Sequence, residues 1–99
     1  MVHGFGYKPK TTFWQDFTIA EEFGAKAVKD TFNRVFKEWK GNYEYLTELV
    51  LVLNHKIWVW YEKNDELAKL YNELWEKADM YACENLKGEA LDYFYTTTD

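Results

Sequence analysis

Two side chains of the sequence have the type and the spacing for acid–base chemistry. Glu48 and His55 are seven residues apart in a predicted helix, so they share one face, about 10 Å apart along its axis. That separation prevents direct contact, but a small molecule could bridge it. Two polar residues on the less buried side of a helix give the same pattern. A small-molecule-binding or enzymatic helical bundle around this pair is therefore the third of three functions that we weigh.

Other catalytic chemistry has little support. The chain has no serine, and Cys83 lies one position off the apolar stripe of its predicted helix, as expected of an inert thiol. His3, His55 and Cys83 are isolated, and no metal-binding or phosphate-binding motif is present. We therefore expect no catalytic residue, no cofactor and no metal, and we predict that the protein is not an enzyme.

The aromatic content favours protein binding. The chain has five Trp, eight Tyr and seven Phe, more ring surface than one small core needs. Trp and Tyr give large contact areas at modest entropic cost, which makes them common anchors of interfaces. The densest group is Trp58, Trp60 and Tyr61. We expect these three to bind a protein partner or a second copy of the chain, although rings that only enlarge the core remain the alternative.

The charge pattern leaves nucleic-acid binding as the second function. Five residues fall within about 80° of one face of a predicted helix: Lys26, Lys29, Asn33, Lys37 and Lys40. The turn at Gly24 and Ala25 has the small residues of a helix-turn-helix, which favours a small DNA-binding regulator that uses the basic face of helix 25–40. The net charge of −5 opposes it, because such domains are usually basic.

The elements that must position these residues are all predicted helices. Apolar residues recur every three or four positions and no segment alternates as a strand does. We predict an all-α bundle, one domain over residues 1–99, with long helices at about 25–40, 43–62 and 65–87 and short ones near 18–24 and 89–95. Residues 1–14 are expected to form an extended or flexible arm. Thr18 and Glu21 match a capping box, which places the start of the first short helix.

The segment 43–62 is apolar on all sides. Five consecutive aliphatic residues, 49–53, cover the whole circumference of a helix. Such a helix is either central in the bundle or covered by a second chain. The chain has no run of about 18 apolar residues and no basic-then-apolar leader, so we expect a cytoplasmic protein.

Several blocks of the sequence resemble a known group of proteins over residues 14–99. They are IAEEFG at 19–24, KDTFNR at 29–34, LTEL at 46–49, LNHKIW at 53–58, LYNELW at 70–75 and YFYTTTD at 93–99. Together they resemble small proteins carried by phages and conjugative elements of Gram-positive gut bacteria. The group has no assigned reaction, so the resemblance implies no catalytic residue. It implies an accessory protein of a mobile element that binds and modulates a host or defence protein complex.

Overall fold

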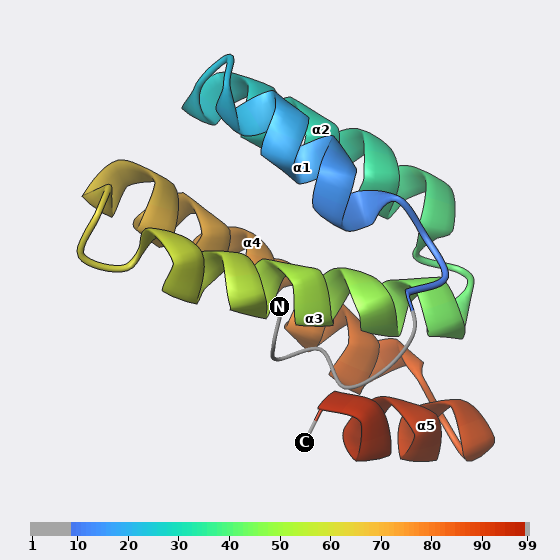
Figure 1. Ribbon diagram of the computed structural model, residues 1–99. Coiled ribbons are helices and arrows are strands. Elements are labelled where there is room, and N and C mark those ends of the chain that lie inside the picture. The colour runs from blue at the N-terminus through green and yellow to red at the C-terminus, as the bar shows by residue number, and fades with distance from the viewer. Residues whose placement is uncertain (1–8, 99) are drawn as a thin grey trace.

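Five helices make up the part of the chain that the structure, a computed structural model, describes, which is residues 9–98 (Figure 1). No strand occurs within these residues, which confirms the all-α prediction. The helices are α1 (Phe13–Glu21), α2 (Ala25–Trp39), α3 (Tyr43–Trp60), α4 (Asp65–Asn85) and α5 (Glu89–Thr98).

Helix α3 is the centre of the molecule. The α1–α2 hairpin packs on one side of it, α4 runs beside it, and α5 packs near its first half (Figure 1). Residues 46–53 of α3 are all buried, including the aliphatic run that covers its whole circumference. Its apolar surface is therefore covered by neighbouring helices of the same chain, as one of the two sequence-based alternatives requires.

The other helices contribute one apolar stripe each to a single core. The stripe of α4 is the most regular, with Leu67, Tyr71, Leu74, Ala78 and Ala82 buried at helical spacing. Full burial of a large apolar side chain contributes about 1.5–3 kcal/mol. The fold therefore depends mainly on these stripes closing around α3.

Two asparagines set the starts of the long helices. The Asn42 side chain accepts hydrogen bonds from the backbone amides of Glu44 and Tyr45 at the start of α3. Asn64 accepts one from Leu67 N at the start of α4. These bonds satisfy amides that have no partner within their own helix.

The first helix differs from the prediction. It begins at Phe13 and ends at Glu21, whereas the capping-box match placed a helix near 18–24. Thr18 lies inside the helix, where its hydroxyl donates to Trp14 O. The predicted capping box is therefore wrong. Of the described residues of the predicted arm, only 9–12 lie outside a helix, because Phe13 and Trp14 belong to α1. Residues 1–8 of that arm, including His3, lie outside the described residues.

The last helix is longer than predicted and the others end slightly earlier. Helix α5 runs to Thr98, whose hydroxyl donates to Phe94 O, and does not stop near residue 95. The three long helices end at residues 39, 60 and 85, within two residues of the predicted ends. Gly24 and Gly88 have positive φ angles of 111° and 58°, which only glycine adopts without strain. Both lie between helices, where the chain must change direction.

Candidate functional site

Two aromatic rings project from the end of α3. Trp58 is 64% exposed and Tyr61 is 53% exposed, and their ring centroids lie 5.3 Å apart. Both exposed fractions are high for large rings. The contact between the rings limits their mobility, so this pair is a preformed apolar surface and not two independent side chains.

The backbone after α3 holds Tyr61 in place. Trp60 O accepts hydrogen bonds from Lys63 N at 2.9 Å and Asn64 N at 3.0 Å, which closes a tight turn. Glu62 in this turn has a φ of 67°, the only positive φ of a non-glycine residue among those described. A residue with a side chain pays about 1–2 kcal/mol for this conformation. The strain lies directly beside the exposed ring pair.

Trp60 does not belong to the exposed pair. Two positions along a helix turn the side chain by about 200°, and Trp60 packs against the hydrophobic core. Its indole Nε1 is buried and has no hydrogen-bond partner within residues 9–98. Of the three predicted protein-binding residues, the structure therefore brings together Trp58 and Tyr61 on the surface, whereas Trp60 is half-buried against the core.

Acidic residues follow the ring pair directly in the chain. Glu62, Asp65 and Glu66 are exposed in the turn and in the first turn of α4, and Lys63 is the only basic residue among them. The local charge is about −2 in this segment, within a chain of net charge −5. We call Trp58 and Tyr61 with these carboxylates the α3-end surface.

The predicted basic face lies on α2 and is exposed. All five of its residues are exposed, but Lys26 pairs with Asp30 at 2.9 Å. Lys26 and Lys29 also share a groove with Glu66, Lys69 and Glu73 of α4. Carboxylates from two helices therefore interrupt the positive potential that a phosphate backbone would need.

The angle between the two helices of the α1–α2 hairpin, which carries this face, is unusual for a DNA-binding helix-turn-helix motif. The start of α1 faces the end of α2, with Phe13 and Asp16 beside Trp39 and Arg34, so the two helices run side by side in opposite directions (Figure 1). Helix-turn-helix motifs cross at about 90–120° instead. The small residues at Gly24 therefore make a tight antiparallel turn here.

Glu48 and His55 have separate local roles. Glu48 is buried, and its Oε1 accepts from Lys10 N at 2.7 Å while its Oε2 accepts from Thr11 N at 3.2 Å and from the Thr11 hydroxyl. Nδ1 of His55 lies 2.9 Å from Leu51 O, one turn back in α3. The Glu48 carboxylate, which its spacing from His55 indicated for acid–base chemistry, thus anchors the segment before α1 to α3.

A buried charged cluster surrounds Lys56, and no sequence pattern predicted it. The lysine is 2% exposed, and its Nζ lies 3.0 Å from Glu21 Oε2, 2.7 Å from Thr18 Oγ1 and 4.0 Å from the centre of the Trp14 ring. Tyr71 donates to the same Glu21 oxygen at 2.6 Å. The cluster ties α1 to α3 and α4.

The electrostatics of this cluster follow from its burial. Burial lowers the pKa of Lys56, and the nearby Glu21 carboxylate partly opposes that shift. Burial also raises the pKa of Tyr71, and its hydrogen bond to Glu21 adds to the effect. A lysine within a mostly apolar segment was the one signal in the sequence, because buried lysines are almost always paired.

Comparisons with known proteins identify no relative. No protein-family model, no curated protein and no solved structure matches the chain. Within residues 9–98 no helix is long and apolar enough to span a membrane. No group of three or more His, Cys, Asp or Glu side chains in that part of the chain could hold a metal ion.

Proposed function

We propose that this protein is a non-enzymatic protein-interaction module that binds its partner through the α3-end surface. The observation that carries the proposal is the exposed, contacting pair of Trp58 and Tyr61. Interface energy is concentrated in a few Trp, Tyr and Arg residues that enter pockets on the partner. The cost of ordering these two rings on binding is small, because they already contact each other.

The carboxylates that follow the rings in the chain favour a partner with a basic surface. Glu62, Asp65 and Glu66 favour a partner whose apolar pocket has a basic rim, since complementary potentials raise the association rate and exclude wrong partners. The net charge of −5 acts in the same direction at long range. Basic rims are typical of proteins that bind nucleic acids, so the chain would compete for such a groove.

A second copy of the chain suits this surface less well. A two-fold contact would bring the same patch from both copies together, and the acidic residues around each ring pair would then repel. The central helix also needs no second chain, because its aliphatic residues 49–53 are already buried. We therefore propose a foreign partner in preference to a homodimer.

The proposed setting is the cytoplasm of a bacterium that carries a mobile element. The resemblance of residues 14–99 to small proteins of phages and conjugative elements supports this setting. There the partner would be a host or defence protein, and binding would modulate the complex to which it belongs. The basic face of α2 remains exposed in this arrangement, but the carboxylates beside Lys26 and Lys29 make it a weaker candidate.

The test is affinity capture from bacterial lysate with three purified baits. They are the wild-type chain, the double variant Trp58→Ala/Tyr61→Ala, and the control Met80→Ala, which removes an exposed apolar side chain from α4. We expect the wild type and the control to retain the same proteins and the double variant to lose them. Equal retention by the double variant, or no specific protein on the wild type, would contradict the proposal. Circular dichroism of each bait checks that it is folded.

A further inference from the structure

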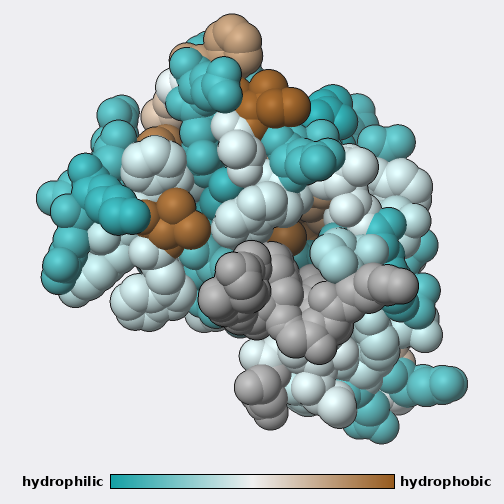
Figure 2. Space-filling model, viewed as in Figure 1, coloured by the Kyte–Doolittle hydropathy of each residue, from teal (hydrophilic) through white to brown (hydrophobic). Residues whose placement is uncertain are grey.

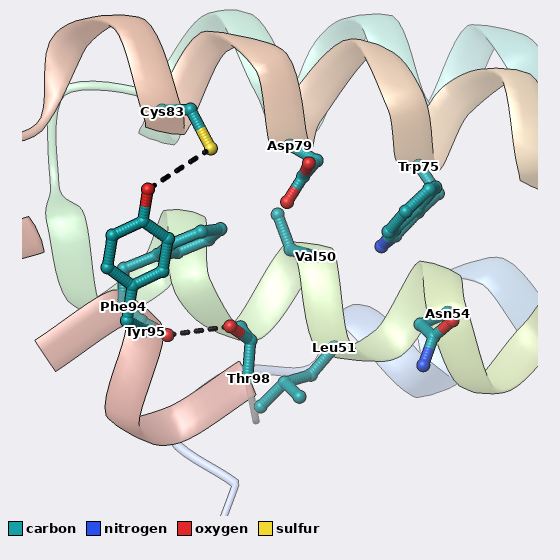
Figure 3. A pocket seen from close by; sticks show the side chains of 9 residues that line it. All are labelled: Val50, Leu51, Asn54, Trp75, Asp79, Cys83, Phe94, Tyr95 and Thr98. Atoms are coloured by element: carbon teal, nitrogen blue, oxygen red, sulfur yellow. Dashed lines mark hydrogen bonds between the residues drawn. The ribbon is translucent and has the colours of Figure 1, made fainter.

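A small pocket lies between α3, α4 and α5, away from the α3-end surface (Figure 3). Helix α4 supplies Trp75 and Asp79, which are four residues apart and therefore share one face. Helix α5 supplies Phe94 and Tyr95, and α3 supplies Asn54. The pocket exists because α5 packs against α3 at the end where α4 passes over both.

Asp79 is the only residue of the pocket wall that is ionised at neutral pH. Figure 3 shows its carboxylate pointing from α4 into the space above α3, with Tyr95 on one side and Trp75 on the other. Within residues 9–98 this carboxylate has no hydrogen bond and no ion pair. Asp79 is half-buried, and this burial raises the pKa of its carboxyl because it removes part of the hydration of the charged form. A cation in the pocket would compensate that cost.

The aromatic walls favour the same kind of ligand. The negative faces of Trp and Tyr rings attract cations, by about 0.5–2 kcal/mol each depending on how far the site excludes water. Tyr95 Oη lies 4.0 Å from Cys83 Sγ, a contact that limits rotation of the ring. Because the wall has no basic residue and contains the Asp79 carboxylate, an anion would find no cationic partner in it and would be repelled by that carboxylate.

The size of the pocket limits the ligand further. Its volume is about 260 Å³, which is below the range of about 300–1,000 Å³ for drug-sized ligands. A nucleotide or a folded peptide would not fit, but a tetraalkylammonium group would.

We propose that this pocket binds a small organic ammonium ion, held by the Asp79 carboxylate and the rings of Trp75 and Tyr95. The alkyl groups contact the rings and the positive charge faces the carboxylate. Asn54 at the edge of the pocket can accept a hydrogen bond from a hydroxyl or N–H group of the ligand.

The first test compares two ligands on the wild-type chain, by NMR chemical-shift titration and calorimetry. Choline is the cationic probe, and 3,3-dimethylbutan-1-ol has the same shape with carbon in place of the charged nitrogen. We expect choline to bind with a dissociation constant in the millimolar range or below and to shift the Trp75 indole and Tyr95 signals. We expect the neutral alcohol to bind at least about tenfold more weakly, which corresponds to about 1.4 kcal/mol. Equal binding of the two ligands would overturn the proposal. So would the absence of any chemical-shift change with choline at about 100 mM.

The second test uses a pair of variants on α4. Asp79→Asn keeps the shape of the side chain and removes its charge, and Glu76→Gln makes the same charge change at an exposed position of the same helix. We expect choline affinity to fall about tenfold or more in Asp79→Asn and to stay within twofold of wild type in Glu76→Gln. An equal effect of the two variants would show that only the overall charge matters, which would refute a site at Asp79. If Asp79→Asn does not fold, the comparison of the two ligands on the wild-type chain still decides.

Discussion

Removal of one partner from the buried ion pair between Lys56 and Glu21 should destabilise the fold far more than the same change in an exposed pair of similar length. The two side chains are 2% and 9% exposed and lie 3.0 Å apart. Lys26 and Asp30 form a pair at 2.9 Å, but these side chains are 87% and 60% exposed. Since the distances are nearly equal, burial is the main difference between the pairs.

The perturbation is Lys56→Met, which keeps an unbranched chain of similar length and removes the charge. Removal of one partner from a buried pair typically costs about 3–5 kcal/mol, because the other charge is left without compensation. Glu21 keeps its hydrogen bond from Tyr71, so we expect the lower end of that range, about 3 kcal/mol. For a domain of this size, that lowers the melting temperature by roughly 12–24 °C.

The assay is chemical and thermal unfolding of four chains in a double-mutant cycle. Glu21→Gln alone should also cost about 3 kcal/mol, because Lys56 is then buried without an anion. The double variant Lys56→Met/Glu21→Gln contains neither charge, so it should be more stable than the sum of the single effects predicts, by at least about 2 kcal/mol. In the exposed pair, Lys26→Met should change stability by no more than about 0.5 kcal/mol.

Two results would refute this reasoning. If Lys56→Met and Lys26→Met have equally small effects, the Lys56 side chain is solvated and the pair is an ordinary surface contact. If the effects of Lys56→Met and Glu21→Gln simply add, the two charges do not interact across α1 and α3. Either result would also show that the α1–α2 hairpin docks less closely on α3 than the distances of this cluster require.

Three further predictions concern stability. Above pH 10 the unfolded chain releases the Tyr71 proton while the folded chain keeps it, because the pKa of Tyr71 is raised in the folded state. The free energy of unfolding should therefore fall more steeply with pH in wild type than in Tyr71→Phe. Parallel plots of that free energy against pH for the two chains would contradict the buried hydrogen bond. Glu48→Gln should lower the free energy of unfolding by about 2 kcal/mol and speed amide exchange at residues 10 and 11. Glu44→Gln affects only an exposed ion pair with Lys10, so it should lower that free energy by less than about 1 kcal/mol. Equal losses in the two variants would show that Glu48 does not anchor this segment. Glu62→Asn should raise the free energy of unfolding by about 0.5–1 kcal/mol, since Asn tolerates positive φ better; a loss of stability would mean that the Glu62 side chain makes a contact of its own.

Periodicity predicted most of the fold. The segment 43–62 contains an aliphatic run that could have formed a buried strand, but its length and the absence of a turn residue favoured a helix, and α3 is a helix. Its all-round apolar surface also predicted that it would be central or covered by another chain. These inferences succeeded because they use many residues each, so no single contact decides them.

The start of α1 was missed because the residues before it are held by contacts with a distant part of the chain. Thr12 makes no side-chain cap at the start of that helix, and Glu48 holds the preceding residues from 37 positions away in the chain. The four-residue capping pattern at Thr18 was a chance match. Local patterns cannot predict an element whose boundary is set by a tertiary hydrogen bond.

The candidate surface was predicted only in part for a related reason. Helical geometry alone shows that Trp58 and Trp60 point in opposite directions, but the sequence does not show which of them meets the core. Lys56 and Glu21 are 35 residues apart, and nothing local suggests that they pair. The wall of the α3–α4–α5 pocket comes from three helices, so its convergence also appears only in the folded chain.

The face of the molecule shown in Figure 2 is mostly hydrophilic, with a few separate hydrophobic patches. A small aromatic anchor beside charged residues, as in the α3-end surface, is typical of a partner that is bound reversibly. Such binding should weaken as salt is added, because the carboxylates around Tyr61 are exposed.

The most direct test of the central claim is the dissociation constant of the captured partner for Trp58→Ala/Tyr61→Ala, measured by calorimetry beside wild type and Met80→Ala. If the two rings anchor the interface, each should contribute about 1–2 kcal/mol or more. The double variant should then bind at least about 30-fold more weakly, while Met80→Ala binds as wild type does. An affinity of the double variant within twofold of wild type would contradict the claim that the α3-end surface is where the partner binds.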